Sequence, residues 1–210
     1  MKKPFLLVFA VLLAGFSFGQ KGNGTNTNVF SNPLYVRIGY GSPGEDLKSE
    51  KVLTAGAQFE LGSIFYINAV KLPEKLKLGI DATFLSFSGL VNRDSLSKNN
   101  KTNSYFTAGV KLGPCLSYNF AGHWIADAFI KFHPQYFITG EHDKYDAATQ
   151  FKLGSSMGIN IRYKALMIGC EFTSAKYDFD VATTTTRTAL ETTSKTIKLP
   201  VTFISLGVNL

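Results

Sequence analysis

The sequence predicts an all-β protein, a single transmembrane barrel of eight antiparallel strands in up-and-down order. Composition is the first reason: 18 Phe, 9 Tyr and 19 Gly among 210 residues favour strands and turns over helices. Hydropathy is the second. After residue 32, apolar and polar residues alternate along eight segments that turn-rich stretches separate. The length of the chain fits one domain.

The N-terminus has the pattern of a secretory signal peptide at residues 1–19. Lys2 and Lys3 give it a positive start, and residues 5–16 form an apolar core. Residues 17–19 then place small side chains before a cleavage site. The core is too short to span a bilayer as a helix, and no later apolar run reaches the required length. We therefore expect any membrane crossing to use strands.

The remainder divides into a polar segment, residues 20–32, which we expect to be flexible, and a barrel domain, residues 33–210. The eight strands are predicted near residues 34–41, 52–69, 75–87, 105–118, 124–137, 151–163, 166–174 and 196–210.

One face of each predicted strand avoids charge. Near residues 75–87, for example, Leu78 and Ile80 alternate with Lys77 and Asp81. The apolar phase of the eight strands holds no Asp, Glu, Lys or Arg, although these make up 18% of the chain. The opposite phase carries both signs, with more bases than acids: Arg37, Glu60, Lys77, Asp81, Lys111, Asp127, Lys131, Lys152, Arg162, Glu171 and Lys198.

Alternation alone does not say which face points inward, because soluble barrels alternate too. Several predicted strands are long enough to cross a bilayer when tilted, and the glycines fall mostly on the polar face, which favours a narrow polar lumen. Aromatic residues gather toward the strand ends, as in an interfacial girdle. At one level these are Tyr40, Phe84, Tyr105, Phe106, Phe132, Tyr136 and Phe137, and at the other Phe65, Tyr118, Phe120, Trp124 and Tyr163.

The connections also favour a membrane barrel. Long polar loops are predicted near residues 42–51, 88–104, 138–150 and 174–195, and short turns near 72–74, 121–123 and 164–165. Long and short connections alternate in this prediction, as they do when both termini face the periplasm and the long loops lie outside the cell.

The last strand departs from a simple pattern. Its apolar phase slips after Phe203, so that Ile204 and Leu206 become the apolar row, and a β-bulge is expected there. The ending from Gly207 to Leu210 resembles the C-terminal signal by which outer-membrane barrels are recognised for assembly, although it ends in Leu and not in an aromatic residue.

Over residues 33–210 the chain resembles the small outer-membrane barrels of the OmpX, OmpW and OmpA-barrel kind and the PorT-like barrels, by pattern and not by a diagnostic motif. The resemblance implies a Gram-negative outer membrane, contact with outer-membrane lipid and lipopolysaccharide, and barrel-assembly machinery during insertion. It implies function only broadly, because such barrels include adhesion proteins, porin-like channels and parts of secretion machines.

The charged phase is the first candidate site. Side chains fill an eight-stranded barrel, and unpaired buried charges are costly, so the plain interpretation is a network of ion pairs. The alternative is a narrow conducting path, which the excess of bases would make anion-preferring. The second candidate is the 174–195 loop, interpreted as an ordinary surface loop or as a recognition surface with Tyr177, Asp178, Phe179, Asp180, Arg187 and Glu191.

No enzyme activity, cofactor or metal is expected. The histidines His123, His133 and His142 lack metal-ligand spacing, and no phosphate loop or nucleophile elbow is present. Lysines are spread along the chain, which leaves no patch for nucleic acid. Cys115 and Cys170 fall on opposite faces, which favours two free thiols over a disulfide.

The sequence thus predicts a small non-enzymatic barrel that acts through its surface loops, in adhesion or envelope integrity. Two alternatives stay open at this point. One is an accessory component of an outer-membrane secretion or assembly machine, bound to another envelope protein. The other is a narrow channel for small solutes.

Overall fold

The computed structural model describes residues 30, 33–44, 55–91, 104–139, 149–185 and 189–210. The predicted signal peptide lies outside these residues. In the described part of the chain, no helix is long and apolar enough to span a bilayer.

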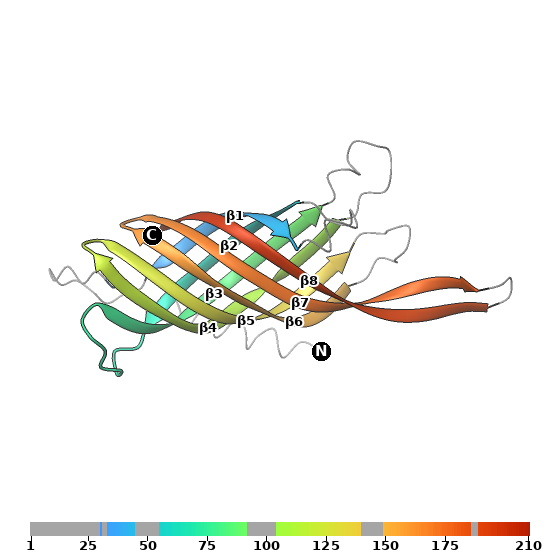
Figure 1. Cartoon of the computed structure of the whole chain (residues 1–210), viewed down its shortest axis with the longest axis horizontal. Coiled ribbons are helices and arrows are strands. Elements are labelled where there is room, and N and C mark those ends of the chain that lie inside the picture. The colour runs from blue at the N-terminus through green and yellow to red at the C-terminus, as the bar shows by residue number, and fades with distance from the viewer. Residues whose placement is uncertain (1–29, 31–32, 45–54, 92–103, 140–148, 186–188) are drawn as a thin grey trace.

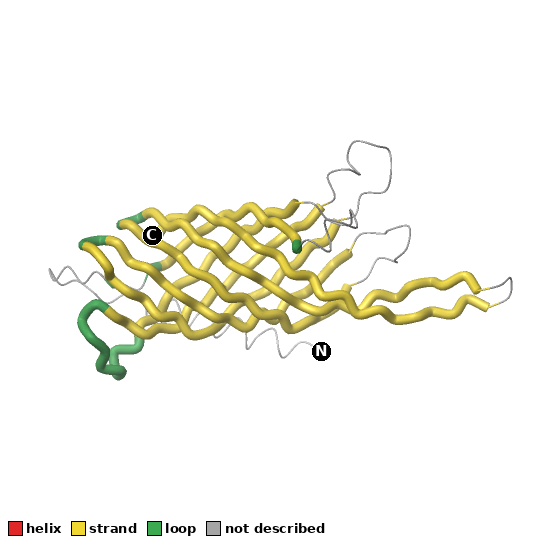
Figure 2. The backbone as a smooth tube through the Cα atoms, in the orientation of Figure 1, coloured by secondary structure: helices red, strands yellow, loops and turns green. Residues whose placement is uncertain are grey.

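Eight strands form one closed barrel in sequential order, and every neighbouring pair is antiparallel (Figures 1 and 2). The predicted fold class is confirmed. The strands are β1 (Leu34–Pro43), β2 (Ala55–Tyr66), β3 (Leu76–Val91), β4 (Ser104–Ala121), β5 (Trp124–Thr139), β6 (Thr149–Tyr163), β7 (Leu166–Thr185) and β8 (Ala189–Asn209).

Alternate side chains point outward and inward along each strand, as a pleated backbone requires. On β5, Ile130 and Phe132 are 58% and 64% exposed, whereas Lys131 between them is fully buried. The apolar phase therefore faces outward and the charged phase faces the lumen, which is the inverse of a soluble barrel.

The β-bulge predicted in the last strand is wrong. β8 pairs with β1 and with β7 without any register shift, and Leu199, Val201 and Phe203 are buried while Lys198 is exposed. The phase does not slip at Phe203. The inward-facing residues of β8 change from apolar to small and polar along the strand. Register shifts occur elsewhere, between Leu61 and Gly62, between Thr83 and Ser86, and between Asn119 and Ala121.

The predicted alternation of long and short connections holds only in part. Two connections are two-residue turns, residues 122–123 and 164–165, but the turn predicted near residues 72–74 is part of a connection that spans residues 67–75. The long loop predicted at residues 174–195 is wrong, because most of it is strand.

β7 and β8 continue as a two-stranded ribbon beyond the barrel wall. Pairing of β6 with β7 ends at Ser174, and pairing of β1 with β8 ends at Val201. The ladder between β7 and β8 runs on to Thr185 and Ala189. With about 3.4 Å per residue, this ribbon is roughly 35 Å long, and it projects beyond one end of the barrel (Figure 1). We call residues 175–199 the hairpin.

Candidate functional site

Four charged side chains from four strands meet inside the barrel. Arg37 on β1 forms ion pairs with Glu60 on β2 and Glu171 on β7. Lys111 on β4 forms ion pairs with the same two carboxylates, at 2.5 Å from Glu60. All four are at most 2% exposed. We call them the charge tetrad.

Polar neighbours complete the bonding of the tetrad. Gln58 and Ser86 donate hydrogen bonds to Glu60, and Arg37 donates one to the side-chain oxygen of Asn160 at 3.1 Å. Because buried charges are stable only when paired and hydrogen-bonded, these bonds fix the tetrad in one arrangement.

Two further ion pairs lie in the lumen. Lys131 contacts Asp81 at 3.0 Å, and the hydroxyl of Tyr35 donates to the same carboxylate at 2.7 Å. Arg162 binds Asp127 through two parallel hydrogen bonds of 2.6 and 2.9 Å, the bidentate geometry that suits a guanidinium and a carboxylate.

Eight of the predicted interior charges are therefore brought together, in equal numbers of each sign. Lys77 and Lys152 also take inward positions, nearer the strand ends, and are half-buried. The prediction that Lys198 lies in the lumen is wrong, since its side chain is exposed on the outer face. Sequence reasoning assigned it inward because Lys198 alternates with Leu199 and Val201, and these were expected to form the outward apolar row.

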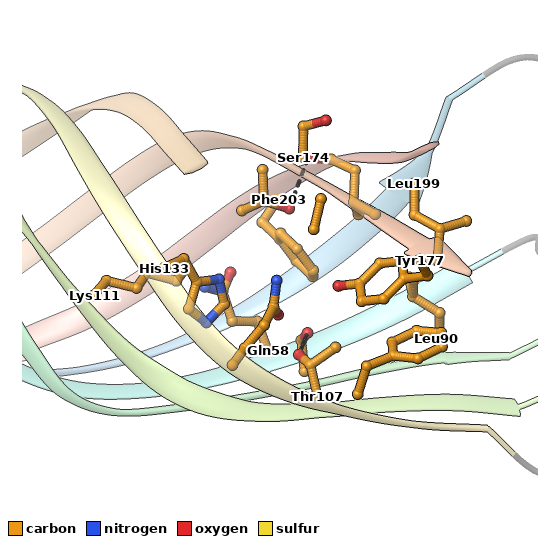
Figure 3. A pocket seen from close by; sticks show the side chains of 15 residues that line it. Gln58, Leu90, Thr107, Lys111, His133, Ser174, Tyr177, Leu199 and Phe203 are labelled. Carbon is orange, nitrogen blue, oxygen red and sulfur yellow. Dashed lines mark hydrogen bonds between the residues drawn. The ribbon is translucent and has the colours of Figure 1, made fainter. Parts of the chain in front are cut away.

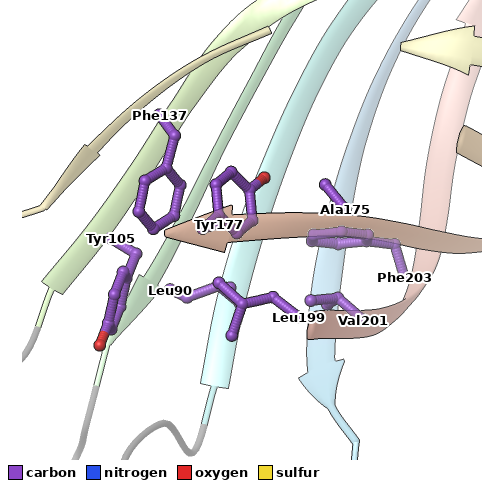
Figure 4. Close-up of a cluster of buried hydrophobic side chains, with 8 residues drawn as sticks. All are labelled: Leu90, Tyr105, Phe137, Ala175, Tyr177, Leu199, Val201 and Phe203. Atoms are coloured by element: carbon purple, nitrogen blue, oxygen red, sulfur yellow. The ribbon is translucent and has the colours of Figure 1, made fainter. Parts of the chain in front are cut away.

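A cluster of apolar side chains closes the lumen at the end from which the hairpin projects (Figure 4). We call it the apolar plug. Tyr177 is 3% exposed and its ring stacks on Phe137, with 3.7 Å between ring centroids. The plug consists of Leu90, Tyr105, Phe137, Ala175, Tyr177, Leu199, Val201 and Phe203.

The plug corrects two predictions. Tyr177 is not a surface recognition residue, because it points into the lumen at the base of the hairpin (Figure 3). Tyr105 and Phe137 are not members of an outward aromatic girdle, since both are buried in the plug. Sequence reasoning missed one signal: inward and outward positions alternate without a break from Leu199 to Ser205 along β8.

Between the plug and the tetrad the side chains leave a cavity of about 30 Å³, lined in part by Gln58, Lys111 and His133 (Figure 3). That volume holds a water molecule or two. His133 Nε2 and Gln58 Oε1 are buried there without a hydrogen-bond partner among the described atoms, which suits such a water.

A second apolar cluster packs inside the opposite half of the barrel around Tyr35, Ile64, Cys115, Phe129 and Met167. Beside this cluster, the ring of Phe30, which precedes β1, lies 5.5 Å from the ring of Tyr66.

The two cysteines are free: Cys115 is buried in this second cluster and Cys170 is exposed on the outer face.

The remaining residues predicted for a recognition surface belong to the hairpin. Asp178, Phe179, Asp180 and Glu191 lie in its two strands. Arg187 lies outside the described residues. Among the described residues, no group of three or more His, Cys, Asp or Glu side chains could hold a metal ion.

The outer face of the barrel is a continuous apolar surface with aromatic residues toward both ends. Trp124 packs on Tyr163 at one end, with 4.6 Å between ring centroids, and Tyr136 packs on Phe151 at the other, at 5.2 Å. The exposed apolar side chains include Ile38, Leu112, Ile130, Phe132, Leu153, Ile159, Leu166, Ile168, Ile204 and Leu206.

A closed barrel satisfies its backbone internally, and an apolar outside around a charged inside is stable only in lipid. These features define the class: the chain is a small β-barrel protein of the outer membrane.

No protein-family model and no curated protein matches the chain. Among solved structures, Neisserial surface protein A superposes with a TM-score of 0.46 and 7% identity, over 85% of this chain and 96% of that one. Ail, the attachment invasion locus protein of Yersinia pestis, superposes in two structures with TM-scores of 0.44 and 0.45 and 11% identity, over 85% of this chain and 99% of that one. One of these contains the heparin analogue sucrose octasulfate.

Proposed function

We propose that this protein is a sealed, non-enzymatic barrel that acts at the cell surface by presenting its hairpin to another protein. One observation carries the proposal: the β7–β8 ladder continues from Ala175 to Thr185 with no neighbouring strand in the described chain. Each strand of the hairpin therefore offers an open edge of backbone donors and acceptors. Such edges bind extended segments of other proteins by strand addition.

The lumen supports this proposal by disfavouring a channel. The charge tetrad and the apolar plug lie in series along the barrel, and the cavity between them holds a water molecule or two. A sealed barrel serves as an anchor, and the parts outside the membrane are left to make contacts. Adhesion and support of envelope integrity are the roles that such an anchor with a projecting hairpin can fill.

A shortened hairpin tests the proposal. Residues 178–196 are replaced by Asn-Gly, which joins Tyr177 to Ile197, a directly opposed pair, by a two-residue turn. The plug and the barrel wall stay intact. Cells that carry this variant or the full chain are compared for attachment to immobilised surface proteins and for resistance to detergent. A heat-dependent gel shift and equal amounts in the outer membrane establish that both barrels fold.

We expect the shortened variant to lose attachment while it keeps its gel shift. Equal attachment by both proteins would overturn the proposal. A stoichiometric envelope partner that co-purifies with the full chain, and is lost with the hairpin, would place the protein in a secretion or assembly machine instead. Stable single-channel conductance of the full chain in planar bilayers would contradict the sealed lumen.

A further inference from the structure

The outward-facing surface of the barrel changes from apolar to basic at one place. Among the outward-facing strand residues whose side chains the structure describes, Lys176 and Lys198 are the only charged ones. Both are exposed, and they are direct partners in the β7–β8 ladder. Their neighbours Ala175, Tyr177 and Leu199 point inward into the plug, which fixes both lysines on the outside.

This arrangement brings two like charges together. Directly opposed residues of an antiparallel pair have Cβ atoms about 4.5–5.5 Å apart, and like charges at that distance repel. No described acidic side chain forms an ion pair with either lysine. Two ammonium groups held side by side, neither of them in an ion pair with a side chain that the structure describes, offer donors to one compact anion.

The position of the pair indicates which anion. Below the lysines on the same outer face lie Phe172 and Ile204, which are 40% and 62% exposed and belong to the apolar belt. Only one cross-strand pair, Ser174 and Pro200, separates the lysines from Phe172 and its partner. The lysines therefore stand at the border between the lipid chains and the headgroups. The hairpin projects from this end, so with the hairpin at the cell surface, as proposed above, this border lies in the outer leaflet.

We propose that Lys176 and Lys198 together bind a phosphate group of an outer-leaflet glycolipid, of the lipid A class that anchors lipopolysaccharide. The acyl chains of that lipid lie against Phe172 and Ile204, and its phosphate relieves the repulsion between the lysines. Because the lysines sit at the base of the hairpin, the bound lipid also steadies the hairpin where it leaves the membrane.

Binding of purified lipid tests this site. The full chain in detergent micelles is titrated with diphosphoryl lipid A or with the same lipid after its phosphates are removed, and native mass spectrometry measures the bound fraction. The variant Lys176→Gln/Lys198→Gln is compared with Lys71→Gln/Lys75→Gln. That control removes the same charge from two exposed lysines at the opposite end of the barrel.

We expect the site variant to bind diphosphoryl lipid A roughly 25-fold more weakly than wild type, since each lysine near an anionic lipid surface contributes about a factor of five. The control should bind as wild type does, and millimolar inorganic phosphate should not compete. Equal affinity of the site variant and the control would overturn the proposal, as would equal binding of the dephosphorylated lipid by wild type.

A single charge reversal distinguishes lipid binding from a purely structural role. Lys198→Glu places an opposite charge beside Lys176, which should stabilise the hairpin while it abolishes the preference for phosphorylated lipid. Retained preference in this variant would contradict the site. The hairpin-shortened protein keeps both lysines and should still bind the lipid, so failure of the proposed function and failure of this site give different results.

Discussion

Removing Arg37 tests the charge tetrad. Arg37 is 1% exposed and pairs with both Glu60 and Glu171. In Arg37→Met the two buried carboxylates share the ammonium group of Lys111, and one negative charge is left without a partner. Breaking a buried ion pair from one side costs about 3–5 kcal/mol. We expect the free energy of unfolding to fall by about that amount.

A second variant separates lost charge from lost packing. Arg37→Met/Glu171→Gln leaves Lys111 and Glu60 as a balanced pair, 2.5 Å apart. We expect it to recover about 2 kcal/mol of the loss, because residues of one buried network couple by about 0.5–3 kcal/mol.

Urea unfolding in phospholipid vesicles measures both variants. Trp124 is the only tryptophan of the chain and packs on Tyr163, so its fluorescence reports the folded wall. The gel shift gives an independent measure of the folded fraction. If Arg37→Met lowered the free energy of unfolding by less than about 1 kcal/mol, the reasoning would be refuted, because breaking a buried ion pair costs more than that. A double variant less stable than Arg37→Met would refute it as well.

Two further predictions concern the packing at Gly113 and the state of the two cysteines. In Gly113→Ala the new Cβ would lie 1.9 Å from the carbonyl oxygen of Ile130, so β4 and β5 must separate, and we expect a loss of about 1–3 kcal/mol in urea unfolding. Gly89→Ala is the control, since its Cβ would lie 3.9 Å from the nearest atom, and similar losses in both would refute the steric argument. We expect maleimide to label both Cys115 and Cys170 in denatured protein that has not been reduced. Intact mass spectrometry counts the labels, and a protein without label would contain a disulfide.

The fold was predictable because the physics of a lipid-embedded barrel acts on every strand alike. Lipid excludes charge from the outward face, and a narrow lumen admits only small or paired side chains inward. On β6, Ile159 and Ile161 therefore alternate with Gly158, Asn160 and Arg162. This alternation can be recognised in the sequence without knowing which strands pair.

The partners within the lumen could not be predicted in the same way. Arg37 and Glu60 are directly opposite on neighbouring strands, so pairing of sequential strands suggests their contact. Arg37 and Glu171 lie 134 residues apart, on two strands that β8 separates in the barrel wall, and they meet in the lumen. Their meeting depends on the tilt and stagger that close the sheet, because these set the height of each inward residue. The alternation in the sequence shows whether a residue points into the lumen or outward. It does not show how far along the barrel axis the residue lies.

The hairpin was misread for a related reason. Long polar segments rich in Thr are typical of loops, and Thr is also a residue that favours strands. Residues 183–186 are four consecutive threonines, with no alternation to mark a strand. A two-stranded ribbon outside the membrane has neither a lipid face nor a lumen face, so nothing imposes the alternation by which the eight wall segments were recognised.

The wrong phase in β8 follows from a change of chemistry along the lumen. The prediction assumed that the inward face is polar throughout, so the apolar row of Leu199, Val201 and Phe203 was assigned outward and a bulge was needed to restore Ser205 to the inside. The unbroken register shows one inward row whose surroundings change from the apolar plug to polar side chains. Tyr105 and Phe137 carried the same information on two other strands, where they were interpreted as interfacial aromatics. Inward positions that become apolar at the same end of the barrel on β4, β5 and β8 are better explained by one plug than by separate irregularities.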